Sequence, residues 1–143
     1  MLTDSFYTTQ AMMIAEAMAA RGEDVRLYHF TQKPEGEAGE VLGAFHASEL
    51  PYVGIASSTY LGPVNNAILA DYMSSYWTNF AKTGDPSGDG LPEWESMPAS
   101  AEEWFVLGPE VGPKPIPKEK LDLFKPIIPD YINGPEKFNA AHS

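Results

Sequence analysis

The sequence predicts an α/β fold of which this chain holds only a part. Three stretches carry that expectation: an Ala- and Met-rich helix over 5–20, a strand over 25–31 with bulky residues on both faces, and a long apolar helix over 63–82. A strand with two bulky faces belongs in the interior of a sheet, where it has neighbours on both edges. Because few other strands are expected, most of that sheet should lie outside these 143 residues.

Both helices have an expected beginning and end. Asp4 is a suitable N-cap for the first helix, which should stop at Gly22. In the second helix Pro63 stands in the first turn, Gly84 follows the end, and large apolar residues recur every four positions. The stripe carries several aromatic rings, so the helix over 63–82 is expected to be deeply buried.

The remaining segments are shorter. Residues 32–45 hold a proline, three glycines and three glutamates, which is typical of a solvated loop. The other expectations are a turn-rich loop over 83–95, a short strand over 102–108, a proline-rich connector to Pro117, a last helix over 118–125 and an irregular tail over about 127–143. On length, the chain 1–143 is one domain or one portion of a larger one.

Composition argues against several classes of partner. A net charge of −11 repels phosphate backbones, so no nucleic acid is expected, and an anionic membrane surface is disfavoured. The uncharged run over 50–70 contains prolines, glycines and asparagines and is too polar to span a membrane. The N-terminus lacks a signal-peptide pattern and is expected to be a start inside a longer gene.

The residue types also limit the chemistry. With no cysteine, thiolate nucleophiles, disulfides and cysteine-based zinc sites are excluded. The three histidines lack zinc-protease spacing and no phosphate-binding loop is present, so neither a metal nor a cofactor is expected. No serine stands in a Gly-x-Ser-x-Gly turn, so the chain lacks a recognisable nucleophile elbow.

One histidine stands in a distinctive loop. The stretch GEVLGAFHASELPYVG, residues 39–54, places His46 after the strand over 25–31 and three positions before Glu49. A histidine there can be a general base, a metal ligand or a structural residue, and by position alone a structural role is the commonest. Glu49 by itself is most simply a solvated loop carboxylate.

The motif GAFHASELPYVG resembles the histidine loop of the type-B carboxylesterases, the family that includes cholinesterases and bacterial para-nitrobenzyl esterases. YWTNFAKTGDPS and LPEWESM, further along the chain, are similar to the family segments that follow that loop. DSFYTTQAMMIAEAMAARGEDVRLYHF resembles the helix and strand just before it. The likeness runs in order from residue 4 to about residue 107.

The resemblance implies the C-terminal portion of an α/β-hydrolase domain, with the last sheet strands, the histidine loop, a long buried helix and a C-terminal helix. It implies a triad of serine, then Glu or Asp, then histidine, in which His46 is the general base acting on a small-molecule ester. It also implies supporting roles for Asp4, in a hydrogen-bond network near the histidine rather than as the triad acid, and for Glu49. A helix cap is the simpler role for Asp4.

The family's serine, acid and oxyanion-hole glycines lie upstream of the portion present here. The chain alone is therefore expected to be inactive. Its expected partner is the missing N-terminal portion of the domain or a second copy of the chain, on which the helix over 63–82 would pack. Two alternatives stay open: a non-catalytic, cholinesterase-like binding protein, and a truncated gene product.

Overall fold

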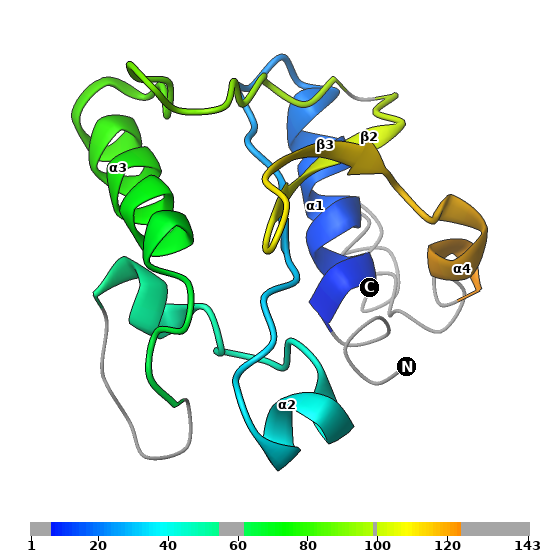
Figure 1. Cartoon of the computed structure of the whole chain (residues 1–143). Coiled ribbons are helices and arrows are strands. Elements are labelled where there is room, and N and C mark those ends of the chain that lie inside the picture. Colours follow the sequence, from blue (N-terminus) through cyan, green and yellow to red (C-terminus); the bar gives the residue numbers. More distant parts are fainter. Residues whose placement is uncertain (1–6, 55–61, 99, 124–143) are drawn as a thin grey trace, which may run out of the picture. The chain divides into compact units, whose positions relative to one another are not determined.

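A computed structural model of the protein describes residues 7–54, 62–98 and 100–123 (Figure 1). The elements along the chain are α1 (Thr9–Ala19), β1 (Tyr28–Phe30), α2 (Glu37–Leu42), the 3-10 helix η2 (Leu50–Val53), α3 (Ala67–Thr83), β2 (Glu103–Leu107), β3 (Gly112–Pro115) and α4 (Lys118–Asp122). The chain divides into two compact units. The sheet unit holds Tyr28–Glu95 and Trp104–Lys114, and the terminal unit holds Met1–Leu27, Ser96–Glu103 and Pro115–Ser143.

The described strands form a sheet in the order β1-β2-β3. β1 and β2 run parallel, with Tyr28 opposite Phe105 and Phe30 opposite Leu107. The backbone N–H of Thr31 donates to the carbonyl of Leu107 at 2.8 Å and extends this ladder beyond β1. The strand expected over 25–31 is therefore present, but only its last part pairs. The strand expected over 102–108 is confirmed as β2.

A cluster of aromatic and aliphatic side chains forms the core of the sheet unit. Trp94 stacks on Phe105 with ring centroids 4.9 Å apart, and Tyr76 meets both rings edge-on at 5.4 and 5.7 Å. Such pairs stabilise a core by about 0.5–1.5 kcal/mol each beyond the area they bury. The buried members are Tyr52, Leu69, Met73, Tyr76, Trp94, Phe105 and Leu107.

The helix expected over 63–82 is confirmed as α3, but it begins four residues later than Pro63 predicts. The side-chain oxygen of Asn66 accepts a hydrogen bond from the backbone N–H of Leu69 at 3.1 Å, which makes Asn66 the N-cap. A capping side chain satisfies one of the orphan N–H groups of the first turn. The hydrogen bond of Asn66 determines where the helix starts, whereas a proline such as Pro63 is only compatible with a helix start.

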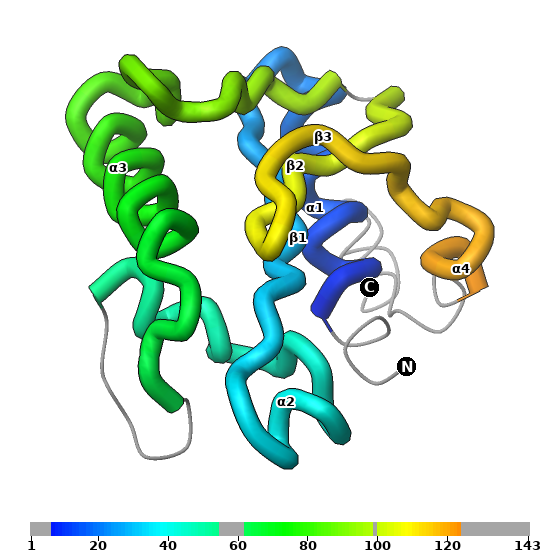
Figure 2. Tube along the Cα trace, viewed as in Figure 1, coloured from blue at the N-terminus to red at the C-terminus, as the bar shows by residue number. Residues whose placement is uncertain are grey.

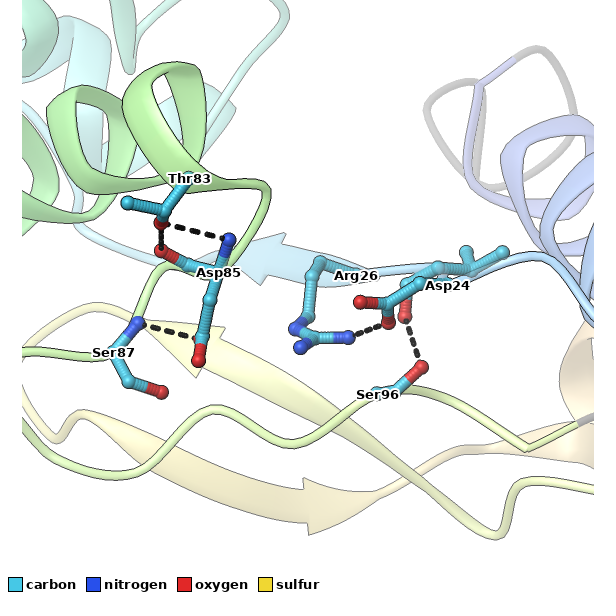
Figure 3. A network of polar contacts seen from close by, with 7 residues as sticks. Asp24, Arg26, Thr83, Asp85, Ser87 and Ser96 are labelled. Atoms are coloured by element: carbon cyan, nitrogen blue, oxygen red, sulfur yellow. Dashed lines mark hydrogen bonds and ion pairs between the residues drawn. The ribbon is translucent and has the colours of Figure 1, made fainter.

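The end of α3 matches its prediction. Gly84 adopts a left-handed conformation with φ 78°, and its N–H donates to the carbonyl of Phe80. Polar contacts then fix the following loop, which Figure 3 shows: the N–H of Asp85 donates to the hydroxyl of Thr83 at 3.2 Å, and the N–H of Ser87 donates to the carboxylate of Asp85 at 2.9 Å.

The expected deep burial of α3 is wrong at its two ends. Tyr76 is fully buried, whereas Ile68 is 66% exposed and Phe80 is 45% exposed. A row of side chains spaced by four advances about 40° around a helix at each step, so the row from Ile68 to Phe80 turns through about 120°. Only its centre can face the core. The continuous buried stripe is instead Leu69, Met73 and Tyr76.

Three elements were not predicted: α2, η2 and β3. α2 lies inside the segment 32–45, which was expected to be a loop. Its Gly39 is buried, and a Cβ atom there would lie 1.8 Å from the carbonyl oxygen of Pro34, so this glycine permits a close backbone contact. β3 lies in the expected connector, where Gly-Pro-Lys-Pro carries none of the residue types typical of strands.

The terminal unit contains α1 and α4. α1 buries Thr9, Met12 and Ala15. The N–H of Met97 donates to the carbonyl of Val25 at 2.8 Å, next to the ion pair of Asp24 and Arg26 drawn in Figure 3. The last helix expected over 118–125 is present as α4. Asp4 and the tail over 127–143 lie outside the described residues. Within the described parts of the chain, no helix is long and apolar enough to cross a membrane.

Candidate functional site

His46 lies at the start of a hydrogen-bonded turn in the sheet unit, between α2 and η2. The N–H of Ser48 donates to the carbonyl of Phe45 at 3.0 Å, and the N–H of Leu50 donates to that of Ala47 at 3.2 Å. The His46 residue is exposed. Figure 2 shows the trace running from β1 through α2 into this turn. The turn therefore follows the carboxyl end of a parallel strand, the edge at which α/β folds collect their reacting groups.

The residue after His46 is held in a strained conformation. Ala47 has φ 69°, and no other described residue except glycine has a positive φ. A non-glycine residue in this region costs about 1–3 kcal/mol and persists only where its surroundings hold it. The hydroxyl of Ser48, in the same turn, is buried without a hydrogen-bond partner among the described residues. Two energetically unfavourable features, the positive φ of Ala47 and the buried Ser48 hydroxyl, therefore lie directly after His46, which is typical of a functional loop.

η2 anchors the far end of this turn through Tyr52, which is 4% exposed. The ring of Tyr52 lies edge-on to Phe30 of β1 with centroids 5.3 Å apart. Its carbonyl accepts a hydrogen bond from the hydroxyl of Ser74 in α3 at 3.3 Å. The turn that carries His46 is thus tied both to the strand before it and to the helix after it.

Two neighbouring asparagines complete this anchorage, and sequence reasoning missed both. The hydroxyl of Tyr52 donates to the side-chain oxygen of Asn65 at 2.5 Å, and the Asn65 amide nitrogen donates to the carbonyl of Lys33 at 3.0 Å. The amide nitrogen of Asn66 donates to the side-chain oxygen of Gln32 at 3.2 Å. No local pattern marks these three hydrogen bonds, because the residues that they join lie 13 to 34 positions apart.

Glu49 occupies the same turn as His46, three positions further along the chain. Glu49 is half-buried. Burial raises the pKa of the Tyr28 phenol, and the negative charge of Glu49 raises it further. Tyr28 itself is held edge-on against Trp77 at 5.2 Å and Trp94 at 6.1 Å. Glu49 is therefore a half-buried carboxylate whose charge acts on the partly buried phenol of Tyr28, which differs from a freely solvated loop residue.

The other described histidine has a packing role. The ring of His29 in β1 stacks on Trp104 of β2 with centroids 4.2 Å apart and an interplanar angle of 12°. His29 therefore contributes to the packing of the sheet. Among the residues that the structure describes, no group of three or more His, Cys, Asp or Glu side chains could hold a metal ion.

Known proteins with the same sequence pattern define the family. The model of the carboxylesterase family matches residues 1–122. Human cocaine esterase is 28% identical over 152 aligned positions, which cover 100% of this chain and 26% of that protein. Human neuroligin-2 is 35% identical over 95 positions, which cover 61% of this chain and 11% of that protein.

A solved structure gives the same result at the level of the fold. The carboxylesterase of Geobacillus stearothermophilus, solved at pH 6.2, matches with a TM-score of 0.58 and 31% identity, over 77% of this chain and 23% of that one. The chain spans about a quarter of the length of cocaine esterase and of this bacterial enzyme. The chain therefore belongs to the carboxylesterase family, and it holds a fragment of the α/β-hydrolase fold.

Proposed function

We propose that this chain supplies the general base of a carboxylic ester hydrolase, and that His46 is that base. The supporting observation is an exposed imidazole on a strained turn that is anchored after the carboxyl end of β1. In this role the neutral imidazole takes the proton of a serine hydroxyl as its oxygen attacks the ester carbonyl. It then returns the proton to the leaving alcohol. A water molecule, deprotonated by the same imidazole, releases the acid from the acyl-enzyme.

Asp4 and Glu49 are supporting residues in this proposal. The charge of Glu49 reaches the neighbouring Tyr28, and a carboxylate in the turn favours the imidazolium that forms during the reaction. Asp4 belongs to the same hydrogen-bond network by family resemblance alone. The triad acid, a Glu or an Asp, comes from another segment.

The serine and the oxyanion-hole donors also come from another segment, and the whole chain 1–143 acts as the C-terminal portion of one domain. Without a nucleophile the isolated chain has little or no turnover: in subtilisin, loss of the serine alone costs about 10⁶ in kcat. The partner is the N-terminal portion of such a domain or a second copy of the chain. Exposed apolar side chains at both ends of α3, Ile68 and Phe80, support packing of this kind.

The test is hydrolysis of para-nitrophenyl acetate by the isolated chain and by the chain joined to the upstream segment of the Geobacillus carboxylesterase. The isolated chain should match its His46→Ala variant, and the joined protein should be active and lose that activity on His46→Ala. His142→Ala, which removes a histidine outside the motif, is the matched control and should change nothing. Full turnover in the joined His46→Ala protein would show that His46 is structural.

A second candidate is a non-catalytic binding protein with the same fold. The observation that favours it is the 35% identity to neuroligin-2, whose name, unlike that of cocaine esterase, is not that of an ester hydrolase. In that case the joined protein folds but does not hydrolyse the ester. A truncated gene product, the third interpretation, predicts that the isolated chain lacks a cooperative unfolding transition.

A further inference from the structure

We propose that Asn65 is a positioning residue that closes the base of the loop bearing His46. The side-chain oxygen of Asn65 accepts from the hydroxyl of Tyr52 at 2.5 Å, and its amide nitrogen donates to the carbonyl of Lys33 at 3.0 Å. A single amide thus joins the two ends of residues 34–51, the His46 loop. This inference rests on the proposed role of His46 as the base.

The chemistry of the site requires an amide. Asparagine presents an acceptor oxygen and a donor nitrogen on one planar group, whereas a carboxylate offers only acceptors and an aliphatic side chain offers neither. Tyr52 is 4% exposed, so its hydroxyl has little access to water and depends on the Asn65 oxygen as an acceptor. The backbone N–H of Asn65 also donates to this hydroxyl at 3.4 Å, which makes the contact two-way.

The contacts that join the two ends of the His46 loop limit where the His46 imidazole can lie. The His46 loop holds 18 residues, from 34 to 51, and the entropy lost when a chain segment of this kind is closed must be met by contacts at its ends. The ring contact of Tyr52 with Phe30 supplies the apolar part and Asn65 supplies the polar part. Displacing a reacting group by only ~1 Å can slow a reaction about 10²-fold, so an exposed imidazole on a long loop needs the two ends of that loop to be held in place.

The neighbouring Asn66 makes a parallel contact with Gln32 but also caps α3, so a variant there would disturb the helix as well. Asn65→Asp is the cleaner change. It keeps an acceptor for the Tyr52 hydroxyl and removes the donor to Lys33. The matched control is Asn79→Asp, since the Asn79 amide nitrogen likewise donates to backbone carbonyls, those of Pro86 and Ser87 at 3.3 and 3.0 Å. That loop is the one drawn in Figure 3.

The experiment is amide hydrogen exchange on the full chain. The reporters are the hydrogen-bonded N–H groups of Ser48, Leu50 and Tyr52 in the His46 turn and of Leu91 in the control loop. Asn65→Asp should accelerate exchange of the first three about ten-fold and leave Leu91 unchanged. The reason is that losing the hydrogen bond to Lys33 makes local opening of the His46 turn more frequent, without affecting the control loop. Asn79→Asp should do the reverse.

A second readout follows the imidazole itself. The ring resonances of His46 should shift or broaden in Asn65→Asp, whereas those of His29, stacked on Trp104, should not. Tyr52→Phe breaks the other end of the tie, and the double variant should open the loop no further than the stronger single variant, because the two ends act as one unit.

Two results would overturn the proposal. One is wild-type exchange at Ser48, Leu50 and Tyr52 in Asn65→Asp. The other is an equal acceleration everywhere, including the N–H of Thr31 in the β1–β2 ladder, which would make Asn65 a residue of general stability. Neither readout involves ester hydrolysis. If Asn65 holds the loop while the joined His46→Ala protein keeps its turnover, the proposed function fails and the role of Asn65 in the loop stands.

Discussion

Replacing Tyr76 by Phe removes one hydroxyl from the centre of the sheet unit and leaves the ring in place. Tyr76 is 0% exposed, and its hydroxyl donates to the carbonyl of Pro92 at 2.6 Å. At neutral pH the variant leaves that carbonyl without its partner, so the free energy of unfolding should fall by about 1–2 kcal/mol. The edge-on contacts of the ring with Trp94 and Phe105 remain, which limits the loss to the polar term.

The same hydroxyl predicts how this difference changes with pH. Burial, with a smaller contribution from Tyr72, raises the pKa of Tyr76 from 10.0 to about 12. A tyrosine with a raised folded-state pKa stabilises the fold fully below pH 10, and that contribution is lost as the pH rises towards 12. At 1.36 kcal/mol per pKa unit, the advantage of the wild type should shrink by about 1 kcal/mol at pH 11.

The assay is urea unfolding followed by far-ultraviolet circular dichroism, on both proteins, at intervals from pH 7 to pH 11.5. Every other titrating group is shared, so the difference between the two curves isolates Tyr76. The expected difference is constant up to about pH 9.5 and then falls. A difference that stays constant through pH 11.5, or that grows, would refute the assignment of a buried neutral phenol at this position.

Two further predictions concern the turn that carries His46. Ala47→Gly should raise the free energy of unfolding by about 1 kcal/mol, because glycine adopts φ 69° without strain. The control Ala38→Gly, in α2, should lower it by roughly 0.5–1 kcal/mol. A loss of stability at both positions in thermal unfolding would contradict the strain at Ala47. Glu49→Gln should lower the pKa of Tyr28, measured by titration of the tyrosine ring carbons, but leave it above 10.0, since burial is the larger cause. The control Glu35→Gln should lower the pKa of Tyr52 instead. An unchanged pKa of Tyr28 in Glu49→Gln would contradict the interaction between these two residues.

How far the sequence predicts this structure differs from element to element. α3 and β2 are identified because their patterns are strong and local: apolar spacing with a glycine stop in one, a run of aromatic and aliphatic residues in the other. α2 is missed because Gly39 lowers the helix propensity of a six-residue segment. A glycine is needed there because of a close backbone contact with Pro34, which only the folded chain reveals. β3 is missed because pairing with β2 overrides its poor propensity.

The candidate site shows the same division. The motif around His46 identifies the residue and its resemblance, and the fold explains why the motif needs the residues beside it. The positive φ of Ala47 and the two-sided contact of Asn65 are properties of chain segments brought together in space. No window of neighbouring residues contains both Lys33 and Asn65, so this tie could not be predicted from the sequence.

β3 has a consequence for how molecules of this chain can associate. Two of its four residues, Pro113 and Pro115, carry no backbone N–H, and β3 stands last in the order of the described strands. An incoming strand finds few donors there, so of the two outer strands in the described part of the sheet β1 is the more receptive edge. Open-ended fibres require two receptive edges on every molecule. In the described sheet, the prolines of β3 therefore disfavour edge-to-edge growth through that strand.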